Sequence, residues 1–209
     1  MKRPFNTVIS TFIVGLVASL ATATLSGSAH AEIPTPKLRI DGIYALIQAA
    51  SAKADTQDQL VTEVTAHLDG LIDYEGFAAR TLKTSWPKLT PTQRDVFMAK
   101  FKALVIRTYA KRFQPKSAFT IEHRGEPGFL NAEKTEAKVQ TTVHGKKVAA
   151  DVDYMLVFRP EKKNWFAFDF VVDDVSMSLN WRGQFEKIIA KEGFDSLIAK
   201  IDKKIQKGD

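Results

Sequence analysis

The amino-acid sequence predicts an α+β fold in which helices from both ends of the chain cover a curved antiparallel sheet. Two observations predict this class. Apolar residues recur at helical spacing before residue 114 and after residue 178, whereas they alternate with polar residues between residues 117 and 172. The short connections between the alternating segments favour an antiparallel meander of four strands, or a slightly larger sheet. Helices packed on the apolar face of such a sheet can enclose an apolar pocket.

Spacing and capping residues predict the N-terminal helices. Residues 38–71 carry apolar side chains at helical spacing, and we expect two helices there with a break near Asp55. Asp73 is expected to cap a third, short helix. This helix should end before Pro87, because a residue that precedes proline avoids the helical region.

The middle and C-terminal helices have sharper boundaries. Thr90 and Gln93 form a reciprocal capping pair around a proline at the first helical position, which predicts a helix from here to about Phe113. Two more helices are predicted at about residues 179–191 and 194–207, with a glycine between them as a C-cap.

Four segments have the alternation of strands, namely residues 119–123, 139–143, 148–158 and 165–172. In the last of them, strict alternation predicts two sets of residues on opposite faces. Phe166, Phe168, Phe170 and Val172 form one set, and Trp165, Ala167, Asp169 and Val171 form the other.

The N-terminus has the features of a secretory signal. Lys2 and Arg3 precede an apolar stretch, and Ala29-His30-Ala31 has the small-x-small pattern that signal peptidase cleaves. We therefore expect residues 1–31 to be a cleaved signal peptide and residues 32–209 to form one soluble domain. Charged residues interrupt every later apolar stretch, so no membrane span is predicted there.

Composition excludes several classes of protein. The chain has no cysteine, which excludes disulfides and a lipid-anchored precursor. The net charge of +6 is mild, and no aromatic and basic platform accompanies it, so nucleic-acid binding is not expected. Neither a nucleophile elbow nor a phosphate-binding glycine loop nor a metal-binding spacing of histidines occurs, so we expect no cofactor and no metal.

Asp173-Asp174 is the strongest candidate for acid or base chemistry. Adjacent residues of a strand point to opposite faces, so the two carboxylates are better explained as the end of a strand. An enzyme that uses Asp169 or Asp173 as a base, together with Tyr154 or His123, stays open as an alternative.

Several motifs together resemble the MlaC family, also called the toluene-tolerance family, over almost the whole chain after residue 31. The motifs are Trp86-x-x-Leu-Thr-Pro-x-Gln-Arg-x-x-Phe97, Phe101-x-x-Leu104-x-x-Arg-Thr-Tyr-Ala110, Trp165-x-x-x-Asp169, Val175-Ser176, Asn180-x-Arg182-x-x-Phe185 and Gly193-Phe194-Asp-x-Leu197. The resemblance implies a periplasmic phospholipid-binding carrier, not an enzyme. Proteins of that family shuttle lipid between an outer-membrane lipoprotein complex and an inner-membrane ABC transporter with an MCE-domain subunit, and so maintain the lipid asymmetry of the outer membrane. We expect such a carrier to be a monomer.

The resemblance also implies a deep pocket for acyl chains. We expect it between the apolar sheet face and the helices, with the head group near Arg182 at the rim. The candidate lipid-binding residues are Phe101, Val105, Tyr109, Tyr154, Leu156, Phe168, Phe170 and Phe185. The opposite sheet face stays open as the pocket lining.

Two departures from the family pattern leave other cargo open. Asp173-Asp174 replaces the usual Glu-Gly, and Trp181 replaces a usual Tyr. A related branch of the family is associated with hopanoid lipids, so the cargo could belong to another lipid class. A protein that binds partners without any cargo is a further alternative.

Overall fold

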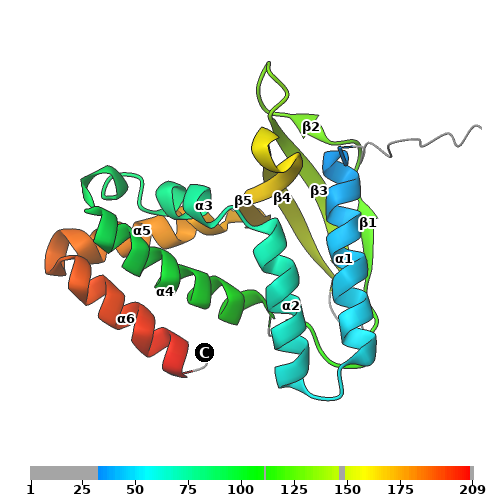
Figure 1. The fold of residues 1–209 in the computed structure, drawn as a ribbon, viewed down its shortest axis with the longest axis horizontal. Helices are drawn as coiled ribbons and strands as arrows, with labels where there is room; N and C mark the ends of the chain where they lie inside the picture. The colour runs from blue at the N-terminus through cyan, green and yellow to red at the C-terminus, as the bar shows by residue number, and fades with distance from the viewer. Residues whose placement is uncertain (1–32, 111, 146–148, 208–209) are drawn as a thin grey trace, which may run out of the picture. The chain divides into compact units, whose positions relative to one another are not determined.

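Helices precede and follow one antiparallel sheet in the computed structural model, which describes residues 33–110, 112–145 and 149–207 (Figure 1). These residues belong to one compact unit that begins at Ile33. The expected signal peptide, residues 1–31, lies outside the described residues. The helices are α1 (Pro36–Lys53), α2 (Gln57–Leu71), α3 (Tyr74–Thr81), α4 (Pro91–Ala110), α5 (Met177–Glu192) and α6 (Phe194–Lys207).

The predicted starts of α2, α3 and α4 are confirmed, because the side chains that predict them make the caps, whereas α4 ends at Ala110 and not at about Phe113. The Thr56 hydroxyl caps α2 and the Asp73 carboxylate caps α3. At the start of α4, Gln93 N–H donates to the Thr90 hydroxyl and Thr90 N–H donates to the Gln93 side chain. Gly193 ends α5 with a φ of 85°, a conformation that glycine adopts without strain. Within the described ranges, no helix is both long and apolar enough to cross a membrane.

The sheet has the strand order β1-β3-β4-β5-β6, and β2 pairs with β3 beyond the end of β1. The meander of four long segments is confirmed, and two short strands enlarge it. The strands are β1 (Thr120–His123), β2 (Gly128–Phe129), β3 (Glu136–His144), β4 (Ala149–Arg159), β5 (Asn164–Val172) and β6 (Val175–Ser176).

Asp173 and Asp174 form the two-residue turn between β5 and β6. Both have positive φ, 47° and 65°, which is the conformation of a tight hairpin turn that aspartate tolerates. Asp173 also accepts a hydrogen bond of 3.0 Å from the backbone N–H of Asp151 on β4. The interpretation of this pair as the end of a strand is confirmed.

A bulge in β5 makes the predicted alternation of this strand wrong for its first half. Met155 pairs with Asp169, but Leu156 pairs with Ala167, so Phe168 is an extra residue without a partner on β4. The bulge shifts the alternation by one. Phe170 and Val172 consequently share a face with Ala167 and Trp165, and Phe166 points to the other face with its pairing partner Val157.

The helices α3, α4 and α5 enclose a closely packed aromatic cluster. The ring of Phe101 lies 5.1 Å from that of Phe77, 5.2 Å from that of Phe97 and 5.2 Å from that of Trp181, measured between centroids. Phe185 stacks on Trp181 at 6.3 Å. The rings of Phe77, Phe97 and Phe101 are fully buried, so this cluster is the filled part of the core.

The carboxylate of Asp169 joins the end of the sheet to the helix that follows it. It is 1% exposed, and it accepts hydrogen bonds from the hydroxyls of Ser176 and Ser178, both at 2.7 Å, and from the backbone N–H of Ser178 at 3.0 Å. Arg80 of α3 lies 3.5 Å from the same carboxylate. Ser176 in turn caps α5. Asp169 therefore fixes β5, α3 and the start of α5 relative to one another.

Replacement of Asp169 by alanine should lower the free energy of unfolding by roughly 3 kcal/mol, because it leaves buried donors of Ser176 and Ser178 without an acceptor. Urea unfolding followed by circular dichroism measures this loss. The exposed turn residue Asp174 provides the control, since Asp174→Asn keeps a residue that tolerates positive φ and should change stability by less than about 0.5 kcal/mol. Equal effects of the two substitutions would contradict this role of Asp169.

Candidate functional site

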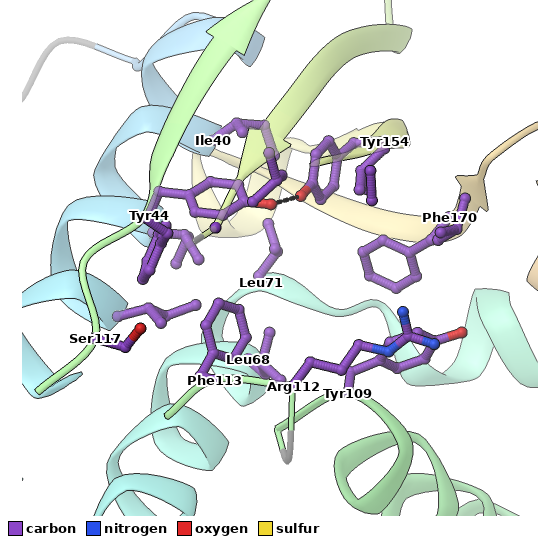
Figure 2. A pocket seen from close by; sticks show the side chains of 18 of the residues that line it. Ile40, Tyr44, Leu68, Leu71, Tyr109, Arg112, Phe113, Ser117, Tyr154 and Phe170 are labelled. Carbon is purple, nitrogen blue, oxygen red and sulfur yellow. Dashed lines mark hydrogen bonds between the residues drawn. The ribbon is translucent and has the colours of Figure 1, made fainter. Parts of the chain in front are cut away.

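An apolar cavity of about 710 Å³ lies between α1, α2, the end of α4 and the sheet (Figure 2). Its interior consists mainly of aliphatic side chains from these elements. They are Ile40, Ile43, Ile47, Leu68, Leu71, Ile72, Val143, Ala150, Val152 and Val172. On β4, Ala150, Val152 and Tyr154 line the cavity; all three lie on one face of the strand.

The mouth of the cavity is marked by residues that both line it and are exposed. Arg112, Gln114 and Ala118 follow the end of α4, and Gly145 follows β3. Deeper in the cavity, Ile40 and Leu71 are almost completely buried, with exposed fractions of 0% and 2%. The lining therefore changes from polar groups near solvent to aliphatic groups inside.

Two tyrosines supply most of the polarity inside the cavity. The hydroxyl of Tyr44 on α1 and that of Tyr154 on β4 share a hydrogen bond across the cavity wall (Figure 2). Burial raises the pKa of Tyr44 to about 12 and raises the pKa of Tyr154 well above its ordinary value. Both phenols are neutral at physiological pH, so they add no charge to the interior.

Polar contacts hold α1 against the sheet. A nitrogen of His123 on β1 lies 2.6 Å from the Asp41 carboxylate, and Gln48 donates to the carbonyl of Phe119 at 3.0 Å. Near the start of the helix, two residues before Asp41, Arg39 donates to the carbonyl of Trp165 at 3.2 Å. Together with the tyrosine pair, these contacts fix the position of α1 while its isoleucines border open space.

The structure brings three of the predicted lipid-binding residues to the cavity. Tyr109, Tyr154 and Phe170 line it, and the rings of Tyr109 and Phe170 lie 6.0 Å apart. Tyr109 also lies 6.4 Å from Trp181, so it connects the cavity to the aromatic cluster.

The remaining predicted residues do not line the cavity. Phe101, Val105 and Phe185 belong to the packed core around the aromatic cluster, and Leu156 is fully buried between Ala137 and Ala167 on the neighbouring strands. Phe168, the extra residue of the bulge, has its ring under the guanidinium of Arg80, and the ring centroid lies 5.2 Å from the guanidinium carbon. Arg182, which was predicted at the rim, donates instead to the carbonyl of Arg80 on α3 at 3.1 Å.

Sequence reasoning missed the contributions of α1, α2 and the segment that follows α4. The stripe Ile40, Ile43, Tyr44 and Ile47 was visible as a helical pattern, but such a stripe is also typical of a filled core. Residues 112–119 have no periodic pattern, so nothing in the sequence indicated that they border the cavity.

Of the candidate catalytic residues, Tyr154 lines the cavity, whereas the other three lie elsewhere. Asp169 is bound by serine donors, Asp173 lies in the hairpin turn, and His123 contacts Asp41. None of them is among the described residues that line the cavity. The described parts of the chain also contain no group of three or more acidic or histidine side chains that could hold a metal ion.

Comparisons with known proteins show what the chain is similar to. The family model described as "MlaC protein" matches residues 39–203. A solved structure of a phospholipid-binding protein from Ralstonia solanacearum, in complex with a phospholipid, has the same fold with a TM-score of 0.71. The two sequences are 20% identical, and the match covers 81% of this chain and 96% of the other. A comparison with curated protein sequences gives no significant match.

The tyrosine pair predicts a loss of stability in alkali. The pKa of Tyr44 is about 12 in the folded protein against an ordinary value of 10, so between these pH values the unfolded chain releases protons that the folded chain retains. The free energy of unfolding should therefore fall as the pH rises from about 10 to 12, by about 1.4 kcal/mol per pH unit for each tyrosine that stays protonated.

Urea unfolding at several pH values measures this slope. The double variant Tyr44→Phe/Tyr154→Phe lacks both phenols and should show a shallower fall than the unaltered protein. Equal slopes for the two proteins would show that this pair does not carry a raised pKa.

Proposed function

The chain belongs to the MlaC family, whose model spans most of its length, and we propose on this premise that its cavity binds the acyl chains of a phospholipid. The observation that carries the proposal is the apolar cavity between α1 and the sheet. Its volume of about 710 Å³ lies within the range of roughly 300–1,000 Å³ that is typical of small-molecule sites. The similar fold of a protein that was solved with a phospholipid supports the same proposal.

The free energy of transfer explains why a lipid needs such a carrier. Moving one methylene from an apolar environment into water costs ~0.8 kcal/mol, so two acyl chains with about thirty methylenes face a cost of roughly 24 kcal/mol. A protein lowers this cost only if it encloses the chains. Aliphatic walls such as Ile43, Ile47 and Leu68 supply that environment.

We place this binding in the periplasm, with the N-terminal signal as the route of export. The carrier, as a monomer, would take lipid between an outer-membrane lipoprotein complex and an inner-membrane MCE-type ABC transporter, and so contribute to the lipid asymmetry of the outer membrane. The alternative cargo is a lipid of a hopanoid-related class. Lipid analysis distinguishes this cargo from a phospholipid. No bond needs to be made or broken in this function.

Lipid analysis tests the proposal directly. The protein, purified from the periplasm without detergent, is extracted with organic solvent, and the extract is examined by mass spectrometry. We expect phospholipid in a nearly stoichiometric amount. Repeated preparations without bound lipid would contradict the proposal, and an extract that contains a hopanoid instead would replace the cargo.

A bulky residue on the cavity wall should block loading. Val152 lines the cavity, whereas Val157 lies on the opposite face of the same strand. Val152→Trp should weaken lipid binding by about tenfold or more, because the indole occupies space that acyl chains need. Val157→Trp should leave binding unchanged.

Lipid per folded protein, measured after incubation with phospholipid vesicles, compares the two variants. Circular dichroism confirms that both are folded. Equal loading of Val152→Trp and Val157→Trp would show that acyl chains do not use this part of the cavity.

A further inference from the structure

One residue in the cavity lining differs from all the others in charge. Among the described residues that line the cavity, Arg112 alone carries a formal charge. It follows the last turn of α4 and is exposed, so it stands at the mouth. An isolated cation at the entrance of an apolar cavity is a feature that burial of acyl chains does not require.

We propose that Arg112 binds the anionic phosphate of the lipid and thereby selects amphiphiles with a phosphate head group over neutral ones with the same chains. The inference rests on the proposed function, because it places the head group of the same cargo. A planar guanidinium with five N–H donors matches the oxygens of a phosphate and can bind two of them at once.

The contacts of Arg112 leave its donors available. Its guanidinium lies over the ring of Tyr109, 5.8 Å from the centroid, and within the described residues no carboxylate pairs with it (Figure 2). Two other arginines, by contrast, are paired with carboxylates. Arg124 pairs with Asp151 and Asp153, and Arg159 pairs with Asp73.

The ring beneath Arg112 adds a second polar group to the same region. The hydroxyl of Tyr109 is buried and makes no hydrogen bond within the described part of the chain. Buried hydroxyls usually have a partner, and a phosphate oxygen is an acceptor for a phenol as well as for a guanidinium. Tyr109 lies in the last turn of α4 and Arg112 follows it, and Trp181 of the aromatic cluster contacts both Tyr109 and Phe101 of this helix.

This placement also orients the cargo. A phosphate at Arg112 lies at the mouth, and chains that extend from it can pass Phe113 toward the aliphatic interior around Leu68 and Leu71 (Figure 2). The reverse orientation would put a charged group among aliphatic side chains without a counter-charge, which is strongly unfavourable. The lining therefore favours one direction of entry, with the tails first.

A competition between two lipids tests the inference. Delipidated protein is incubated with vesicles that contain equal amounts of phosphatidylglycerol and of diacylglycerol with the same chains, and the bound lipids are quantified by mass spectrometry. The unaltered protein should prefer phosphatidylglycerol by about tenfold, the gain expected of a charge-assisted hydrogen-bonded pair. Arg112→Gln should bring this ratio close to one while diacylglycerol loading stays the same, and Arg112→Lys should retain part of the preference.

Arg182→Gln is the matched control, because Arg182 is only partly buried, donates to the backbone carbonyl of Arg80 and is not among the residues that line the cavity. It should keep the preference of the unaltered protein. An Arg112→Gln variant with an unchanged ratio would overturn the inference and leave the proposed function intact. Failure of the unaltered protein to load either lipid would overturn both. Diacylglycerol loading reports on folding, since a variant that still binds the neutral lipid has an intact cavity.

Discussion

The arrangement depends on one constraint, which is that polar side chains hold α1 at the sheet beside the apolar cavity. The hydroxyls of Tyr44 and Tyr154 meet across the gap, and Asp41 and His123 do the same nearer the helix start. The apolar side chains between these contacts face one another across open space.

The fold divides its apolar residues between two tasks. The aromatic cluster of α3, α4 and α5 is filled, with fully buried rings at contact distance, and it provides the rigid body of the protein. The cavity between α1, α2 and the sheet is lined by side chains of similar apolarity but is not filled. Tyr109 belongs to both regions, so the packed cluster positions the wall of the cavity and its mouth. Substitutions in the first region should act on stability, and those in the second on cargo.

Local signals made most of the fold predictable, because caps and turns act over a few residues. The reciprocal pair of Thr90 and Gln93, the cap at Asp73 and the glycine at 193 all stand where the sequence indicated. The bulge at Phe168 was not predictable, because a single extra residue leaves no mark in an alternating pattern.

The site was less predictable than the fold for a physical reason. A side chain that lines a cavity and one that fills a core have the same apolar character, and only the distance between elements distinguishes Ile43 from Phe101. Arg112 was equally inconspicuous, because it comes directly after a helix with several basic residues. Only its position at the mouth of the cavity distinguishes it from the other basic residues.

The central claim is that acyl chains occupy the space between α1 and the sheet. A high-resolution crystal structure of the protein, purified without detergent, tests this most directly. We expect continuous elongated density that begins near Arg112 and runs past Phe113 to Tyr154 and Leu71. A structure in which the isoleucines of α1 pack against Val152 and Phe170, with no density and no space for a chain, would contradict the account.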